Sequence, residues 1–137
     1  MGSRIDIRYL AGLFDGEGSV SIRVSQGYAS CRLQLSMTAK RPVFALSHAF
    51  GGSLHKVKEP TQGGLTEWHW TLSSHKAIRQ LLQRLLPYLQ VKHRQAKLAI
   101  AFCKRMEKGS QGRPVSMKEH AIRRQYAMQC RRLNGTL

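Results

Sequence analysis

The chain has 137 residues, of which 23 are Lys or Arg and only seven are Asp or Glu, so its formal net charge is +16. With 42% hydrophobic residues, a chain of this length can bury a core, which excludes general disorder, and no apolar run approaches the length of a membrane span. The charge favours a polyanionic partner, nucleic acid first and an anionic membrane second, and it argues against an enzyme for small neutral metabolites.

The three cysteines, Cys31, Cys103 and Cys130, lie far apart and form no C-x-x-C pair. Their number and spacing exclude a zinc finger and predict reduced thiols. Together with the lack of a secretory signal pattern, they indicate an intracellular protein, with the compartment left open.

The first half of the chain alternates between helical and strand periodicities. Apolar residues recur at helical spacing over residues 5–14, and we expect this helix to end within 15–18, where two glycines lie close together. Residues 19–25 and 30–38 each alternate between apolar and polar side chains, and the pair Gln26-Gly27 between them predicts a hairpin turn. Pro42 then suits the first turn of a short helix over residues 42–50.

The second half begins with another predicted hairpin, formed by residues 53–58 and 65–72, in which Trp68, Trp70 and Leu72 would join the core. Ser74 is expected to cap a helix that breaks near Pro87, and a further helix is expected over about 92–106. The pattern Ser116-x-x-Glu119 is a capping box for a last helix that would end before Gly135.

This order of elements predicts an α+β fold in which a four-stranded antiparallel sheet carries helices on one face. The other face would be open, polar and partly basic, and a twisted antiparallel ribbon of this kind fits the major groove of DNA. A merely solvated face remains the alternative from this pattern alone. The candidate DNA-binding residues, which include those that follow the first hairpin, are Ser21, Arg23, Ser25, Arg32, Gln34, Ser36, Thr38, Lys40, Arg41, Lys56, Lys58, Glu67, His69 and Thr71.

From Lys92 onward the chain has twelve basic residues and two acidic ones. We expect these basic helices to contact phosphates, which fixes the position of a protein on DNA without reading its sequence.

Residues 10–18, Leu10-Ala11-Gly12-Leu13-Phe14-Asp15-Gly16-Glu17-Gly18, resemble the LAGLIDADG signature of homing endonucleases. The following hairpin, helix, hairpin and helix are similar to the αββαββα core of that family, and residues 86–97 resemble its segment with a basic active-site residue. The resemblance covers about residues 5–106 of a single domain over 1–137, with a basic helical extension at about 115–134.

The resemblance implies a homodimer, because the chain holds one copy of the motif and the family pairs two such helices. Gly12 and Gly16 would let the backbones approach closely, with Tyr9 and Leu13 beside them in the interface. Two-fold symmetry implies a nearly palindromic double-stranded DNA target, and no membrane partner is expected.

The resemblance also assigns the chemistry. Glu17 takes the position of the catalytic, metal-binding acid, the carbonyl of Gly16 is a further candidate ligand, and Asp15 has a structural role. Mg²⁺, or Mn²⁺ in its place, would activate a water for phosphodiester hydrolysis. Lys92 is the candidate for the basic residue that stabilises developing charge. The family often places a glutamine near the reactive water, and Lys40 or Arg41 is the candidate for that place here.

The implied function is a site-specific, metal-dependent double-strand DNA endonuclease. The alternative is a protein of the maturase type, which binds DNA or intron RNA without cleavage. RNA affinity and stimulation of splicing without nicking would favour that alternative.

Overall fold

The computed structural model describes residues 5–25, 27–57, 66–109 and 114–135. It confirms the predicted α+β fold, with a four-stranded antiparallel sheet in the order β1-β2-β4-β3. The strands are β1 (Gly18–Ser25), β2 (Tyr28–Met37), β3 (Ser53–Lys56) and β4 (Trp68–Leu72). The helices are α1 (Ile7–Glu17), α2 (Lys40–Phe50), α3 (His75–Leu85), η1 (Leu86–Tyr88), α4 (His93–Glu107) and α5 (Met117–Leu133).

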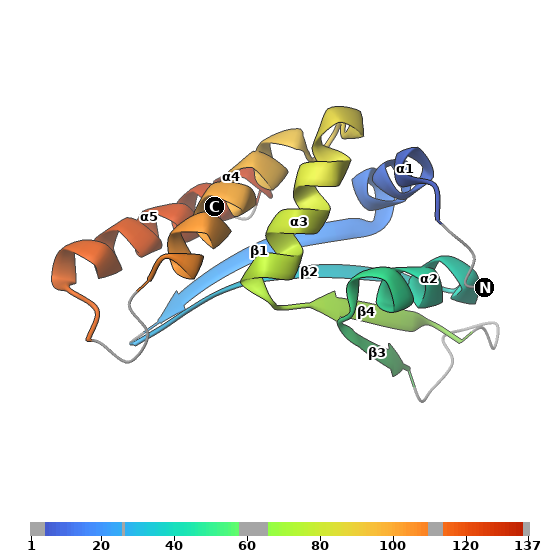
Figure 1. Ribbon diagram of the computed structural model, residues 1–137, viewed down its shortest axis with the longest axis horizontal. Coiled ribbons are helices and arrows are strands. Elements are labelled where there is room, and N and C mark those ends of the chain that lie inside the picture. Colours follow the sequence, from blue (N-terminus) through green and yellow to red (C-terminus); the bar gives the residue numbers. More distant parts are fainter. Residues whose placement is uncertain (1–4, 26, 58–65, 110–113, 136–137) are drawn as a thin grey trace.

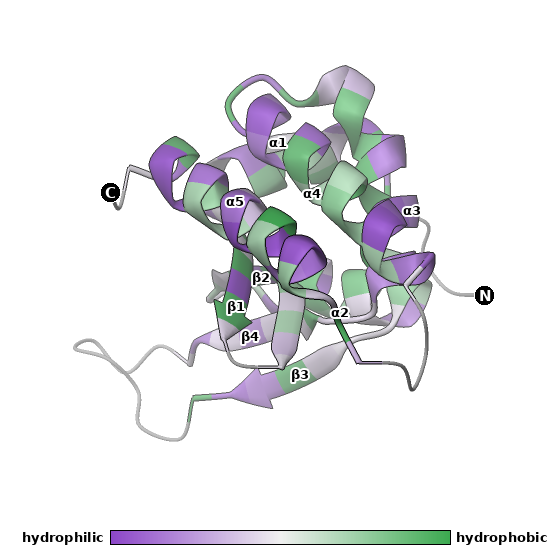
Figure 2. Cartoon of the chain, turned by 90° about the vertical axis from the view of Figure 1, so that its left-hand side faces the viewer, coloured by the Kyte–Doolittle hydropathy of each residue, from purple (hydrophilic) through white to green (hydrophobic). Residues whose placement is uncertain are grey.

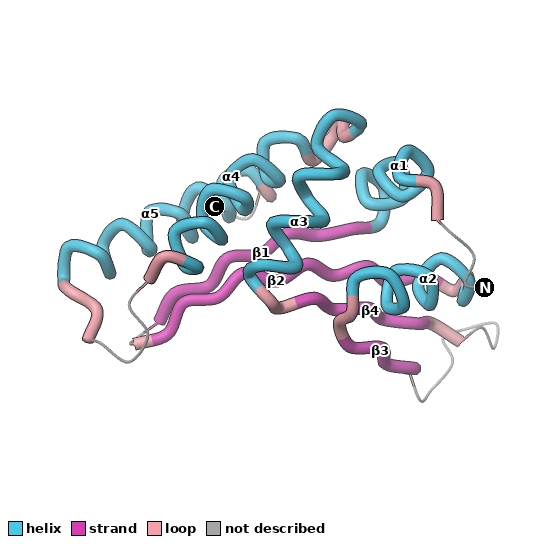
Figure 3. The backbone as a smooth tube through the Cα atoms, in the orientation of Figure 1, coloured by secondary structure: helices cyan, strands magenta, loops and turns pink. Residues whose placement is uncertain are grey.

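The two predicted hairpins join through their second strands, because β2 pairs with β4. Strands β1 and β2 form a long curved ribbon, while β3 is a short edge strand (Figures 1 and 3). The described helices all lie on one side of this sheet, and the opposite side carries none (Figure 2). The sheet therefore has one face that packs against helices and one open face, as the alternating strands predict.

The core lies between the sheet and the helices. Trp70 is fully buried, and its indole Nε1 donates a hydrogen bond of 2.8 Å to the carbonyl of Gly51, which satisfies its one polar atom. Leu72 is buried as predicted, whereas Trp68 is only partly buried and packs against the edge of the core. The other large core side chains come from α1, the strands, α2, α3 and α4, and include Leu10, Phe14, Leu33, Leu35, Leu46, Ile78, Leu81, Leu82, Leu85 and Phe102.

Helix α1 begins two residues later than the apolar pattern indicates and ends within the predicted range. It begins at Ile7 because the carboxylate of Asp6 accepts a hydrogen bond of 2.8 Å from the amide of Arg8, an N-cap that the apolar pattern did not reveal. The prediction that it ends within 15–18 is confirmed, because Glu17 is its last residue and Gly18 is its C-cap. Gly16 does not stop it, since this glycine keeps a negative φ.

Helix α5 covers the outer edge of β1. The side chain of Asn134 donates a hydrogen bond of 2.8 Å to the carbonyl of Val20, and Cys130 lies 3.5 Å from the same oxygen. Ser116 caps the helix as predicted, accepting from the amide of Glu119 at 3.1 Å. The carboxylate of Glu119 makes its bonds to Arg105 and Arg123 of α4 and α5, so the helix contains only one half of the predicted capping box.

The three cysteines are buried and free. A neighbouring thiol, Cys103, and burial both raise the pKa of Cys31 well above its usual range, so this thiol stays protonated and unreactive. No helix in the described part of the chain is long and apolar enough to cross a membrane.

Gly18, at the junction of α1 and β1, is the position where the fold depends most directly on a missing side chain. It is buried, and a Cβ atom there would collide with the ring of Phe14, which is itself 1% exposed and fixed in the core. We expect Gly18→Ala to lower the free energy of unfolding by about 1–3 kcal/mol, the usual range for overpacking a core. Ser19→Ala, at the next and exposed position, is the control and should change it by less than about 0.5 kcal/mol. Equal denaturation midpoints for the two variants would contradict this assignment.

Candidate nuclease site and nucleic-acid interface

The carboxylate of Asp15 joins the end of α1 to the start of α4. One of its oxygens accepts a hydrogen bond from the amide of Gln90 at 2.8 Å, and the other accepts from the amides of Val91 at 3.1 Å and Lys92 at 2.9 Å. Burial by itself would raise the pKa of Asp15, but these three amides and the charge of Lys92 outweigh it and lower the pKa below its usual value. Asp15 therefore has the structural role that the motif implies.

The side chain of Lys92 makes the reciprocal contact between the two helices. Its ammonium donates a hydrogen bond of 2.7 Å to the carbonyl oxygen of Asp15, in the last turn of α1. A cation is favourable at the C-terminus of a helix and an anion at the N-terminus. Lys92 is the N-cap residue of α4 and its own side chain makes no capping bond, so α4 receives the carboxylate of Asp15 while α1 receives the ammonium of Lys92.

Glu17 is the last residue of α1, and its side chain is exposed. Within the described part of the chain its carboxylate forms no hydrogen bond or ion pair. The bond from Lys92 to Asp15 brings the ammonium to the backbone two residues before Glu17. The structure thus gathers three candidate residues from the motif and from residues 86–97 at one place: Asp15, Glu17 and Lys92.

The donor set at this place suits a hard cation only in part. A carboxylate and the carbonyl groups at the end of a helix are the oxygen ligands that Mg²⁺ accepts. Among the described residues, however, no three His, Cys, Asp or Glu side chains gather closely enough to hold a metal ion. One chain supplies a single free carboxylate here, so a phosphate group or a second chain would have to supply further oxygens.

One side of α1 is bare. Tyr9 is 53% exposed, Leu13 is partly exposed, and a Cβ atom added at Gly12 or Gly16 would meet no atom within 4 Å. These four positions follow helical spacing on the side opposite the buried Leu10, Ala11 and Phe14. This bare face of α1 is where another helix could approach closely.

The register of the strands shows which predicted DNA-binding residues share the open face. Ser21 lies opposite Arg32, Gln34 opposite Thr71, and Ser36 opposite His69. Arg23 and Ser25 continue this side of β1 and are exposed. Glu67 also reaches this side, where its carboxylate lies 3.0 Å from the imidazole of His69.

The remaining predicted residues lie elsewhere or outside the described part of the chain. The expected place of Lys56 on the open face is wrong, because its register partner is Trp68, which packs against the core. Lys40 stands in the first turn of α2 with its ammonium 4.9 Å from the ring centre of Phe44 and 5.5 Å from that of Trp68, a cation–π arrangement. Arg41 is exposed beside it, as is Thr38 after the end of β2, and Lys58 lies outside the described residues.

The open face also includes Ser53 and His55 of β3, which the sequence analysis assigned to no role. They pair with Thr71 and His69 of β4. The sequence indicates this placement of Ser53 and His55, because Leu54 is the apolar residue of that short strand and its two neighbours must point the other way.

Comparison with known proteins gives structural likeness without recognisable sequence relatives. No protein-family model matches the chain, and no curated protein matches it significantly. Among solved structures, the archaeal intron-encoded homing endonuclease I-Vdi141I, complexed with DNA, has a TM-score of 0.72 at 14% identity over 93% of this chain and 82% of its own. The homing endonuclease I-CvuI, in complex with its target in the presence of calcium, has a TM-score of 0.67 at 18% identity over 96% and 81%. The homing endonuclease I-TnaI has a TM-score of 0.66 at 16% identity over 98% and 97%.

The Asp15 contacts lead to a test of stability that depends on pH. An asparagine at this position keeps one acceptor oxygen but turns an NH₂ group toward the amides, so Asp15→Asn should lower the free energy of unfolding by about 1–2 kcal/mol at pH 7. Because the pKa of Asp15 is lower in the folded chain than its usual 3.8, the wild-type advantage should be complete above that value and vanish as the pH falls through the folded pKa. Chemical denaturation at several pH values measures this, with Asp6→Asn as the control. A pH-independent difference would contradict the role of the charge.

At 14 to 18% identity these likenesses establish the fold, and the chain has the LAGLIDADG homing-endonuclease fold.

Proposed function

We propose that the chain is a site-specific DNA endonuclease that cuts both strands of a nearly palindromic target as a homodimer. The observation that carries this proposal is the placement of Glu17 and Lys92 together at the end of α1. The described neighbours I-Vdi141I and I-CvuI were solved with DNA, which supports a DNA partner for this fold.

The open face supplies the means to hold duplex DNA. Arg32 and Gln34 stand two residues apart on β2, both exposed, and they can donate to guanine and adenine edges in the major groove. The hydroxyl groups of Ser21 and Thr71 lie beside them across the strand pairs and can donate or accept. Base recognition belongs to these side chains, while the excess positive charge draws in the phosphates.

The end of α1 supplies the means to cut. When bound between Glu17, a helix-end carbonyl such as that of Gly16 and a phosphate oxygen, Mg²⁺ or Mn²⁺ would act as a Lewis acid and lower the pKa of a water. Among the described residues, no cation forms an ion pair with the carboxylate of Glu17, so this group is available to a metal ion. The ammonium of Lys92 lies within reach to stabilise negative charge that develops on a phosphate during in-line displacement.

A second copy of the chain completes this arrangement. The bare face of α1 ends at Glu17, so two copies packed through Gly12 and Gly16 would bring their two Glu17 residues to the same end of the helix pair. Each copy would then serve one strand of the duplex, and a two-fold pair reads a target with two-fold symmetry.

Removing the charge of Glu17 should separate cutting from binding. We expect Glu17→Gln to lower the rate of Mg²⁺-dependent cleavage by at least about 10²-fold, the usual effect of losing a key charged group, and to leave duplex affinity within a few-fold. Cleavage of a site selected from a random DNA library and electrophoretic mobility shift measure the two properties. Glu107→Gln is the control, since this acid pairs with Arg79 at 2.6 Å on the helices and should leave both unchanged. Normal cleavage by Glu17→Gln would show that the site is elsewhere.

The homodimer can be tested on the bare face of α1. Gly12 is exposed, and a Cβ atom there would meet no atom within 4 Å in the single chain, so Gly12→Leu should fold normally, but it should separate two closely packed helices. Sedimentation should report a dimer for the wild type at micromolar concentration and a monomer for Gly12→Leu. Ala121→Leu, at an exposed position of α5, is the matched control and should stay dimeric. A wild-type monomer on its DNA would refute the two-fold scheme.

A further inference from the structure

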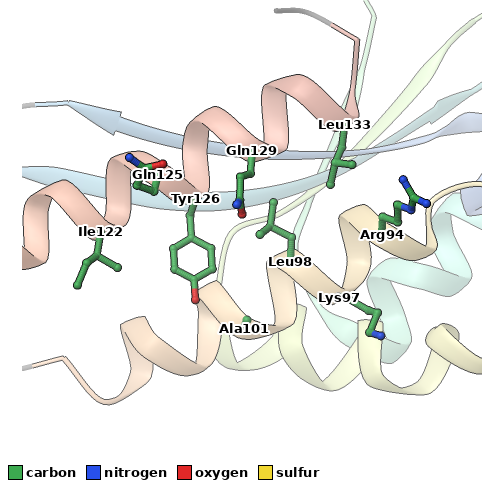
Figure 4. A pocket seen from close by; sticks show the side chains of 9 residues that line it. All are labelled: Arg94, Lys97, Leu98, Ala101, Ile122, Gln125, Tyr126, Gln129 and Leu133. Atoms are coloured by element: carbon green, nitrogen blue, oxygen red, sulfur yellow. The ribbon is translucent and has the colours of Figure 1, made fainter.

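A groove runs between α4 and α5, in the helical layer. Two adjoining hollows of about 630 and 620 Å³ make it up, and they share Ala101 and Tyr126. Figure 4 shows the first hollow, with Leu98 and Lys97 on the α4 side and Gln125 and Gln129 on the α5 side. The groove is therefore a surface distinct from the open face of the sheet.

The α4 side of this groove carries a basic stripe, which we define as Arg94, Lys97, Lys104 and Lys108. With Ala101 between them, these residues follow the helical spacing i, i+3, i+7, i+10 and i+14, and all five are exposed. They lie on the side of α4 opposite the buried Ala96, Ala99 and Cys103. At about 1.5 Å per residue the stripe is about 21 Å long.

The carboxylates in and near the groove are already paired with arginines, and Glu119, Arg105 and Arg123 line the second hollow themselves. Glu119 lies 2.6 Å from Arg105 and 3.0 Å from Arg123, and Glu107 lies 2.6 Å from Arg79. Within the described residues, none of the four residues of the basic stripe forms an ion pair. The stripe therefore keeps its full positive charge, and an anionic ligand is what would neutralise it.

The rest of the groove restricts the form of that anion. Leu98, Ile122 and Leu133 give it an apolar lining, and the amides of Gln125 and Gln129 stand on the α5 side. The axes of two packed helices lie about 8–10 Å apart, so a nucleic-acid duplex cannot enter the groove between them, whereas a single strand can lie along its surface. A stacked strand places a phosphate about every 3.4 Å, so about six phosphates would lie along the stripe.

We propose that the α4–α5 groove binds a single strand of nucleic acid. Its phosphates would lie along the basic stripe, and its sugars and bases would cover the apolar lining and meet the glutamine amides. This site is separate from the surface proposed for duplex DNA, and it would operate whether or not the chain cuts DNA.

The salt dependence of strand binding tests the stripe directly. The variant Lys97→Gln/Lys104→Gln/Lys108→Gln removes three of its charges, and each phosphate contact on a single strand contributes about 0.7 to the slope of log affinity against log salt. We expect this slope to fall in magnitude by about 2 for unstructured pyrimidine oligonucleotides of about 12 residues. The matched control Lys76→Gln/Arg84→Gln/Arg124→Gln removes the same charge from exposed helix positions outside the groove and should change the slope by less than half as much.

The oligonucleotides are supplied in RNA and in DNA form, and binding of either form with this slope change supports the proposal and identifies the preferred sugar. Equal losses in the two triple variants, or no binding of either form to the wild type, would overturn it.

A reciprocal variant distinguishes this site from the proposed duplex site. Arg23→Gln/Arg32→Gln should weaken duplex binding much more than strand binding, whereas the stripe variant should weaken strand binding much more than duplex binding. Loss of strand binding in Arg23→Gln/Arg32→Gln would overturn the proposal by placing the strand on the sheet. Absence of duplex binding or of cleavage in the wild type would instead count against the proposed function alone.

Discussion

The reciprocal contacts between Asp15 and Lys92 are the interaction on which the candidate site depends. It joins residues that lie 75 to 77 positions apart in the sequence and connects the end of one helix to the beginning of another through four hydrogen bonds of 2.7 to 3.1 Å. Each helix end receives the charge that its own dipole prefers. Glu17 is positioned without a bond of its own, because Asp15 fixes the helix two residues before it and the buried Gly18 fixes the chain directly after it. This support leaves the carboxylate of Glu17 free, in a chain that has only seven acidic residues.

The remaining acids explain how the charge is distributed. Glu107 and Glu119 are paired with arginines among the helices, and Glu67 approaches His69 on the sheet. The pKa of Glu119 is lowered by Arg105 and Arg123, and that of Glu107 by Arg79, so both remain ionised in these pairs. Exposed basic side chains outside these pairs lie on two different surfaces among others, Arg23 and Arg32 on the open face of the sheet and the basic stripe on the outer side of α4. A total of +16 on the sequence does not reveal this division, because it depends on which positions point inward.

The sequence predicted the kind and order of the elements well, because period-2 and period-3.6 patterns depend on local residues. It also predicted that Glu17 and Lys92 belong together, although only through the resemblance of two separate segments. The end of α1 within 15–18 was predicted as well, but the amides of residues 90–92 that support its last turn were not. The face of Lys56 was predicted wrongly although its own strand indicates it, because Lys56 lies two residues after the apolar Leu54 and shares its side, where its register partner Trp68 also lies. A lysine at the end of an edge strand can sit on the core side while its ammonium reaches solvent. The groove between α4 and α5 could not be predicted, because it requires the relative placement of two helices.

The packing of α5 against the edge of β1 affects how copies of this chain can associate. An uncovered edge strand offers free carbonyl and amide groups to another strand, which is the commonest accidental route to sheet-to-sheet association. At one edge, Asn134 and Cys130 occupy the outward carbonyl of Val20. At the other edge of the described sheet, β3 offers only four residues, from Ser53 to Lys56, with a lysine at its end. Both edges of the described sheet therefore offer less free backbone to another strand, which disfavours association of copies through their sheets.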